Sequence, residues 1–188
     1  MCQESCRMES VTMSSTNRGS DRRKNDRYMT PTDIILPLLE LVDWTKVDTF
    51  LEPCRGTRNV YDAVPTSVKK YWCEIDEGRD YLTYRPRTRF DLGITNPPFS
   101  LSIEFIDKML AECDSVIFLQ RLNFLGSRTR HAWWKSKSLT SLVIMSSRPK
   151  FEDPETGLGS SDSVEYAWFC LDRAKILQNV GPFHFIDK

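Results

Sequence analysis

The sequence predicts an α/β fold in which helices flank a mostly parallel sheet that ends in an antiparallel strand pair. From residue 28 onward, apolar segments with strand-like and helix-like periodicity alternate along the chain. One strand-like run stops abruptly at Pro97 and Pro98, which cannot donate to a ladder. The last two strand-like segments, 141–145 and 163–172, have no apolar helix between them, so we expect an antiparallel hairpin at one edge.

The individual elements follow from local patterns. Residues 30–43 begin with threonine and aspartate caps and continue with apolar residues at helical spacing, so a helix is expected there, with Pro37 near its first turn. A second helix is expected after Gly56, and a third at 102–113, where the apolar residues share one face. Strands are expected at 47–53, 69–75, 90–98, 115–120, 141–145 and 163–172.

The composition is that of one globular domain. With 188 residues, of which 40% are hydrophobic and 28% charged, the chain can bury a sizeable core. Its 26 basic residues balance 26 acidic ones, so net charge neither indicates nor excludes a nucleic-acid partner. No apolar run approaches the roughly 20 residues that span a bilayer, and the amino terminus lacks the apolar region of a signal peptide. We therefore expect a cytoplasmic protein without membrane contact.

Residues 1–27 and the cysteines set two further bounds. The first 27 residues are rich in Ser, Arg and Asn and lack apolar periodicity, which predicts a disordered tail. The six cysteines are scattered without C-x-x-C pairs. We interpret them as free thiols of a reducing compartment and expect no metal site.

Two strand ends carry a candidate ligand site. Glu52 ends the first strand, and the following turn contains Gly56, where a backbone without Cβ can approach a ligand and a helix start offers free N–H groups. Glu74 ends the second strand, close to the roughly 20-residue spacing at which dinucleotide-binding folds carry an acid for ribose hydroxyls. The alternative is that Gly56 serves only the turn.

The third strand runs into the sequence "TNPPFS", residues 95–100. The prolines end the strand and stiffen the backbone after it, so Asn96 and Phe99 are held at the carboxyl edge of the sheet, where α/β proteins bind ligands. The alternative is a strand-ending turn with Phe99 in the core.

These segments together resemble the class I S-adenosylmethionine-dependent methyltransferases, which have a Rossmann-like fold. More narrowly, the chain resembles the stand-alone enzymes, of the type found in bacteriophages, that methylate adenine N6 in DNA. The resemblance covers most of the chain after the tail and implies that residues 28–188 form a single catalytic domain. The matching segments are YMTPTDIILPLLE (28–40), FLEPCRGTRN (50–59), WCEIDEGRDYL (72–82), TNPPFS (95–100) and RPKFEDPETGLGSSDSVEYAWFCLD (148–172).

The resemblance implies that Asn96, Pro97, Pro98 and Phe99 are the catalytic residues. An exocyclic amine on an aromatic ring is a poor nucleophile because its lone pair is delocalised. If Asn96 Oδ1 and the Pro97 carbonyl each accept one N–H, the nitrogen can become tetrahedral as it attacks, and the acceptors help most in the transition state. Phe99 would stack on the base, which is worth roughly 1–3 kcal/mol.

The resemblance also implies S-adenosylmethionine as cofactor. Glu74 would bind its ribose hydroxyls, and Asp80 with Tyr81 would meet its adenine. The chain departs from the resembling loop at Arg58, which stands where the second glycine usually lies. The other residues assigned to the cofactor are Glu52, Cys54 and Gly56 along its methionine portion and Tyr28, Thr30 and Pro31 closing over it.

A basic and aromatic region predicts contact with nucleic acid. Residues 115–151 contain no Asp or Glu, and tryptophans and Phe124 are interleaved with lysines and arginines, which suits phosphates and unpaired bases. A second basic cluster, 85–89, precedes the catalytic strand. The alternative is that Trp133 and Trp134 pack a helix on the sheet. The predicted contact residues are Arg85, Arg87, Arg121, Phe124, Arg128, Arg130, Trp133 and Lys135.

The sequence thus favours a DNA adenine-N6 methyltransferase with little or no separate target-recognition domain, because no long insertion interrupts the motifs. Two alternatives stay open. One is an RNA methyltransferase acting on adenine N6 or guanine N2, since stacking and basic contacts serve RNA equally well. The other is a non-catalytic nucleic-acid-binding relative whose cofactor loop has changed at Arg58.

Overall fold

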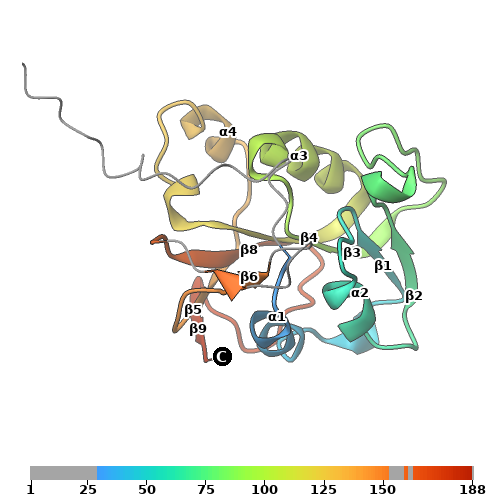
Figure 1. The fold of residues 1–188 in the computed structure, drawn as a ribbon, viewed down its shortest axis with the longest axis horizontal. Helices are drawn as coiled ribbons and strands as arrows, with labels where there is room; N and C mark the ends of the chain where they lie inside the picture. The colour runs from blue at the N-terminus through green and yellow to red at the C-terminus, as the bar shows by residue number, and fades with distance from the viewer. Residues whose placement is uncertain (1–28, 153–158, 161–162, 188) are drawn as a thin grey trace, which may run out of the picture.

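The structure, a computed structural model, describes residues 29–152, 159–160 and 163–187. The predicted tail, 1–27, and Tyr28 lie outside the described residues. The described part is built around one large sheet with helices on both faces (Figure 1).

The sheet has seven strands in the order β2-β1-β3-β4-β8-β5-β9 within the described residues. Strands β1 to β4 pair in parallel, β8 is antiparallel to both of its neighbours, and β9 is parallel to β5. A short separate pair joins β6 and β7. The predicted mostly parallel α/β fold is confirmed. The strands are β1 (Thr49–Glu52), β2 (Lys69–Trp72), β3 (Phe90–Thr95), β4 (Cys113–Arg121), β5 (Ser141–Met145), β6 (Phe151–Glu152), β7 (Gly159–Ser160), β8 (Tyr166–Asp172) and β9 (Phe183–Ile186).

The late strand pair is antiparallel as predicted, but its predicted place at the edge of the sheet is wrong. Strand β8 lies between β4 and β5, and the short strand β9 occupies the edge. All seven residues of β8 are buried, as an interior strand with both faces covered requires. In β9 the side chains of Phe183 and Phe185 are 67% and 70% exposed, which fits an edge strand with one uncovered face.

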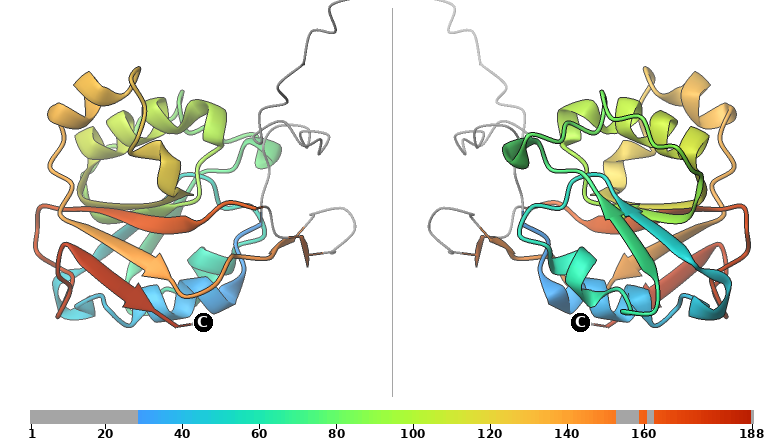
Figure 2. Two further views of the ribbon diagram at one scale, coloured as in Figure 1. Left: turned by 90° about the vertical axis from the view of Figure 1, so that its left-hand side faces the viewer. Right: turned by 90° about the vertical axis from the view of Figure 1, so that its right-hand side faces the viewer.

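The helices form two layers, one on each face of the sheet (Figure 2). Helices α1 (Thr32–Leu39) and α2 (Asn59–Ala63) cover one face, and α3 (Ser102–Glu112) and α4 (His131–Lys135) cover the other. Helix α1 continues through Pro37 and is anchored where Trp168 Nε1 donates to the Ile34 carbonyl at 3.0 Å. No helix in the described ranges is both long and apolar enough to cross a bilayer. Short 3₁₀ turns are η3 (Trp44–Lys46), η4 (Ile75–Glu77), η5 (Phe99–Leu101) and η6 (Leu122–Phe124).

Candidate active site

A cavity of about 510 Å³ opens at the carboxyl ends of β1, β2 and β3. These strands are parallel, so the loops that follow them meet at one edge of the sheet. The cavity brings together most of the residues predicted to bind the cofactor and part of the catalytic motif. The predicted residues that line it are Thr30, Glu52, Cys54, Gly56, Glu74, Asp80, Tyr81, Asn96 and Pro98.

Three other predicted residues do not line this cavity. Pro31 precedes α1 as its N-cap, Pro97 is buried, and Phe99 begins η5 with its ring directed to the neighbouring strands β4 and β8. Sequence reasoning missed several lining residues, because the local pattern does not indicate that these side chains face a ligand cavity. They include Met29, Arg55, Asn59, Ile75, Leu82, Leu101 and Phe105.

The glycine loop, residues 53–58 between β1 and α2, needs Gly56 for two reasons. Its φ is +49°, in the left-handed region that side chains disfavour. A Cβ there would lie 3.1 Å from Met29 Sδ, tighter than an ordinary contact. The Gly56 N–H donates to Glu74 Oε2 at 2.7 Å, and the Asp76 N–H donates to Oε1 at 3.3 Å. The Glu74 carboxylate is thereby oriented at the cavity wall by two backbone donors.

Arg58 stands where the resembling loop usually carries its second glycine, and its backbone adopts a conformation that glycine tolerates best. Its φ of 73° and ψ of 10° are left-handed. Its guanidinium lies 2.9 Å from the carboxylate of Asp62 one turn along α2, and both side chains are about half exposed. Arg58 is not among the residues that line the cavity, so the departure from the motif does not fill the cavity.

Glu52 places a buried acid against the cavity. Its side chain is 2% exposed, and Oε2 has no hydrogen-bond partner among the described residues. Burial raises the pKa of Glu52 well above its usual value, and the Tyr61 backbone N–H and the Arg55 guanidinium offset this only in part. Burial likewise raises the pKa of the neighbouring Cys54 thiol. A ligand that brings a hydrogen-bond donor or a positive charge would satisfy Glu52.

Arg55 joins the glycine loop to the segment after β2. Its guanidinium lies 3.5 Å from the centroid of the Trp72 ring and pairs with Glu77 in η4. Its backbone N–H donates to the Cys73 carbonyl at 3.0 Å. Arg55 Nε has no partner in the described part of the chain. The two loops therefore enclose the cavity as one connected wall.

Asp80 and Tyr81 also line the cavity. Asp80 Oδ1 accepts from the Leu82 backbone N–H at 2.9 Å, which closes a tight turn. The Tyr81 ring is buried against Phe105, and its hydroxyl donates to Glu112 at 2.8 Å. Burial raises the pKa of Tyr81, so this hydroxyl stays protonated. The turn and the ring give this part of the cavity a defined shape.

The NPPF motif follows β3 directly. Asn96 Nδ2 donates to Thr30 Oγ1 at 3.0 Å, and the Pro98 carbonyl accepts from the Leu101 N–H at 2.9 Å as η5 begins. The Phe99 ring lies 6.0 Å from the Tyr166 ring and 5.0 Å from the Arg121 guanidinium. Phe99 thus lies beside the ends of β4 and β8, next to the cavity that Asn96 lines.

The aromatic residues after β4 pack against one another, with Trp133 and Trp134 partly buried. Phe124 is buried, and the rings of Trp133 and Trp134 contact it edge-on. Trp133 Nε1 donates to Asp107 at 3.0 Å, and Trp134 Nε1 donates to the Phe124 carbonyl at 3.1 Å. This packing matches the alternative in which both tryptophans hold a helix on the sheet. The nucleic-acid contact of Phe124 and Trp133 stays a prediction.

Several of the basic residues predicted to contact nucleic acid donate hydrogen bonds within the protein. Arg85 is exposed but donates to the Leu82 carbonyl at 3.0 Å and to the Tyr84 carbonyl at 2.9 Å. Arg130 donates to the carbonyl oxygens of Phe124 at 2.9 Å and Asn123 at 3.3 Å. Arg121 Nε donates to the Tyr166 hydroxyl at 3.1 Å. The exposed predicted residues, whose contact with nucleic acid also stays a prediction, are Arg85, Arg87, Arg128 and Lys135.

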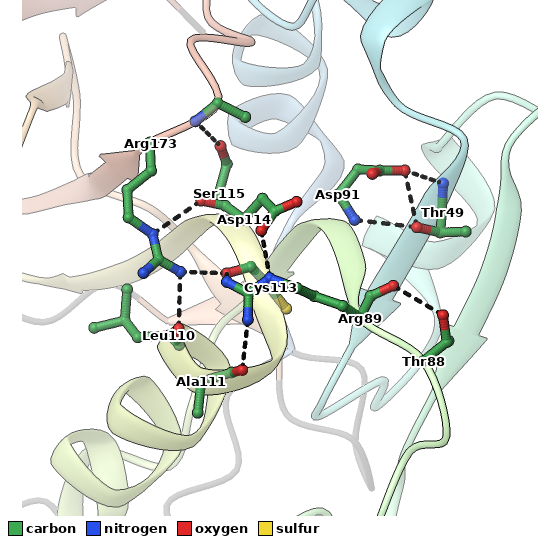
Figure 3. A network of polar contacts seen from close by, with 11 residues as sticks. Thr49, Thr88, Arg89, Asp91, Leu110, Ala111, Cys113, Asp114, Ser115 and Arg173 are labelled. Atoms are coloured by element: carbon green, nitrogen blue, oxygen red, sulfur yellow. Dashed lines mark hydrogen bonds and ion pairs between the residues drawn. The ribbon is translucent and has the colours of Figure 1, made fainter.

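Arg89, in the second basic cluster, has a structural task. Figure 3 shows Arg89 and Arg173 reaching the carbonyl end of α3 and the start of β4. Arg89 donates to the Ala111 carbonyl at 2.7 Å and pairs with Asp114. Arg173 donates to the Leu110 carbonyl at 2.8 Å. Cations at a helix C-terminus satisfy its free carbonyls and oppose the helix dipole, so these arginines stabilise the fold.

Comparison with known proteins shows a likeness in fold. No described protein family matches the chain, and no curated protein does. A Listeria monocytogenes protein assigned to the class I S-adenosylmethionine-dependent methyltransferases superposes with a TM-score of 0.60 at 15% identity, over 92% of this chain and 68% of that one. A methyltransferase subunit of a type I restriction-modification system from Streptococcus thermophilus gives 0.57 at 14%, over 87% and 48%. A Pyrococcus horikoshii protein assigned as an RNA methyltransferase gives 0.56 at 13%, over 78% and 87%.

The fold is therefore the Rossmann-like fold of class I methyltransferases. At these identities the likeness concerns the arrangement of the chain, and activity has to be argued from the site.

Proposed function

We propose that this protein transfers a methyl group from S-adenosylmethionine to the exocyclic N6 amino group of adenine in DNA. The observation that carries the proposal is the meeting of two motifs at one cavity. The glycine loop with its Glu74 carboxylate forms one wall, and Asn96 of the NPPF motif faces the same space.

The residues of the cavity fit S-adenosylmethionine. Glu74 offers an oriented carboxylate for ribose hydroxyls, and Glu52 offers a buried acceptor for the ammonium group. Ile75 and Leu101 line the cavity although both side chains are exposed, which suits the faces of an adenine ring. When bound, the cofactor supplies an electrophilic methyl group on a sulfonium. About 510 Å³ lies in the range of small-molecule sites.

The methyl acceptor would be held by the NPPF motif. Asn96 Oδ1 and the Pro97 carbonyl would accept the two N–H groups of the amine, so that its nitrogen gains electron density as it attacks. The Pro97-Pro98 backbone is rigid, so little reorganisation accompanies the reaction. Phe99 would stack on the base. No general base is required, because the proton can leave to water after transfer.

Adenine in DNA is supported by the NPPF resemblance. The fold is shared with the restriction-modification subunit and with the protein assigned as an RNA methyltransferase, so the fold by itself does not choose between DNA and RNA. The non-catalytic alternative loses its main support, because the Arg58 side chain extends along α2 and is not a cavity-lining residue. A base in a duplex has to be flipped out to reach the motif, whereas a single strand presents it already.

The test uses methyl-labelled S-adenosylmethionine with duplex DNA, single-stranded DNA and structured RNA in separate reactions. Each nucleic acid is digested to nucleosides, and the labelled nucleoside is identified by mass spectrometry. We expect N6-methyladenine from DNA. Asn96→Ala should lower kcat by roughly 10²–10³-fold, as loss of a transition-state hydrogen bond does, while the cofactor Kd changes little.

The outcomes separate the alternatives. Label on guanine or in RNA would keep the mechanism and change the substrate. A fully active Asn96→Ala variant would contradict the mechanism. No label together with no cofactor binding by calorimetry would favour the non-catalytic binder.

A further inference from the structure

The segment Met29–Thr30 lines the cavity and contacts elements that are far from it in the sequence. Met29 pairs with Glu152 of β6 through two backbone hydrogen bonds: the Met29 N–H donates to the Glu152 carbonyl at 3.3 Å, and the Glu152 N–H donates to the Met29 carbonyl at 3.4 Å. Its Sδ lies next to Gly56 of the glycine loop. Asn59, the first residue of α2, donates from Nδ2 to the Thr30 carbonyl at 2.8 Å. The segment is therefore fixed from both sides.

The Thr30 side chain reaches the catalytic motif. Thr30 is 8% exposed, and its Oγ1 accepts a hydrogen bond from Asn96 Nδ2 at 3.0 Å across 66 positions of sequence. The same residue thus contacts Asn59 with its backbone and Asn96 with its side chain. Thr30 therefore links the start of α2 to the loop that follows β3.

The orientation of the Asn96 amide matters for the proposed chemistry. The two ends of a carboxamide are nearly equal in size but opposite in polarity, and rotation about Cβ–Cγ exchanges them. The broad rotational well of this torsion does not select one end by itself. With Nδ2 bonded to Thr30, the acceptor Oδ1 is held at a defined angle on the other side of the group.

We propose that Thr30 is a positioning residue that sets the rotation of the Asn96 amide. Through Asn59, which directly follows the glycine loop, Thr30 also couples this amide to that loop. This proposal rests on the proposed function for its catalytic consequence. An amide free to rotate would present its acceptor in fewer encounters, and small misplacements of a reacting group can cost about 10²-fold in rate. The role differs from the cofactor contact predicted for Thr30, because it acts on the methyl acceptor.

Two variants of Thr30 separate the hydroxyl from the methyl group. Thr30→Val keeps the shape and removes the hydrogen bond, whereas Thr30→Ser keeps the hydroxyl. We expect Thr30→Val to lower kcat about 10- to 100-fold while KM for the nucleic acid and the cofactor Kd change less than about 3-fold. Thr30→Ser should lose less than about 3-fold in kcat. Thr45→Val, the same change at an exposed threonine outside the cavity, is the matched control.

A double-mutant comparison adds a second criterion. In the Asn96→Ala background, Thr30→Val should cause no further loss of kcat, because the two residues act as one unit. Equal losses in Thr30→Ser and Thr30→Val would overturn the proposal in favour of a packing role. A full additional loss in the Asn96→Ala background would overturn it in favour of a direct effect on the cofactor.

A measurement without turnover keeps this proposal separate from the proposed function. The side-chain NH₂ pair of Asn96 can be assigned in a ¹⁵N–¹H spectrum by its absence in Asn96→Ala. We expect Thr30→Val to shift this pair and Thr45→Val to leave it in place. An unshifted pair would overturn the positioning role even in an active enzyme. A shifted pair in a protein that methylates no nucleic acid would support the contact while the proposed function fails.

Discussion

Two regions of the molecule, the cavity and the segment around α4, differ in how far their buried polar groups are hydrogen-bonded. Around the cavity, Glu52 Oε2 and Arg55 Nε are buried without hydrogen-bond partners among the described residues. Gly56 and Arg58 in the same loop have positive φ. In the α4 segment, residues 122–135, the indole N–H groups of both tryptophans have acceptors. None of the residues of this segment has positive φ.

This difference indicates that the residues around the cavity contribute less to the stability of the fold than the α4 segment does. Buried polar groups without partners and left-handed residues each cost free energy, and such features concentrate at ligand sites. Satisfied polar groups and interlocked rings instead stabilise a domain. We therefore infer that the cavity is shaped for a ligand, and that the α4 segment mainly holds the fold together. Substitutions in both regions test this contrast.

Phe124→Ala should have the largest effect on stability. Phe124 is 6% exposed and contacts Trp133, Trp134 and Phe169, so its removal leaves a cavity in the core. Loss of a buried phenylalanine costs about 3–5 kcal/mol of unfolding free energy. Urea denaturation measures this, with the exposed edge residue Phe183→Ala as the matched control. Equal stability of the two variants would mean that the α4 segment does not support the core.

Glu52→Gln should act in opposite directions on binding and stability. Without the buried carboxylate, the cofactor Kd should rise about 10- to 100-fold, in keeping with about 1.5–3 kcal/mol for a hydrogen bond to a charged group. The apoprotein should become more stable, because an unsatisfied buried acid is removed. Calorimetry and thermal unfolding measure the two effects, with Glu104→Gln on the exposed side of α3 as control.

The stability gain of Glu52→Gln should depend on pH. The unfolded chain releases the Glu52 proton near pH 4.5, whereas burial raises the pKa in the folded state, so the folded protein retains the proton longer. The stability that this group contributes is present below pH 4.5 and is lost as pH rises toward the folded pKa. The advantage of the variant should therefore grow between pH 4.5 and 7. A constant difference across this range would contradict the burial of an unsatisfied acid.

Substitution of three glycines by alanine distinguishes the effect of a positive φ from the effect of steric crowding. Gly56→Ala meets both a positive φ and Met29 Sδ, Gly78→Ala meets only a positive φ of +75°, and Gly126→Ala in the α4 segment meets neither. A left-handed non-glycine residue costs roughly 1–2 kcal/mol. We expect destabilisation in the order Gly56, Gly78, Gly126, with the cofactor Kd raised only by Gly56→Ala. Thermal unfolding and calorimetry decide it, and a different order would locate the strain elsewhere.

Arg58→Gly should give the smallest change in unfolding free energy, and this change should be a stabilisation. Glycine adopts φ of 73° without strain, so unfolding free energy should rise by up to about 1 kcal/mol. The lost pair with Asp62 is exposed and contributes little. Because Arg58 does not line the cavity, the cofactor Kd should stay within about 2-fold. A large loss of affinity would show that its guanidinium takes part in binding.

Much of the fold and of the cavity follows from the sequence, because the signals are local. Proline follows Asn96 directly after β3, a glycine turn follows β1, and the acid Glu74 follows β2. Parallel strands carry such residues to one edge wherever the strands lie in the sheet, so Gly56, Glu74 and Asn96 could be placed together without knowing any contact.

The tertiary structure decided what depends on partners distant in sequence. The nearly continuous apolar run of β8 suits an interior strand, but no pattern within β8 indicates that its neighbours are β4 and β5. The direction of the Trp133 and Trp134 rings depends on Phe169 and Asp107. Local periodicity determined the elements and their ends in this protein, whereas long-range packing and hydrogen bonding decided which side chains face the cavity and which face the core.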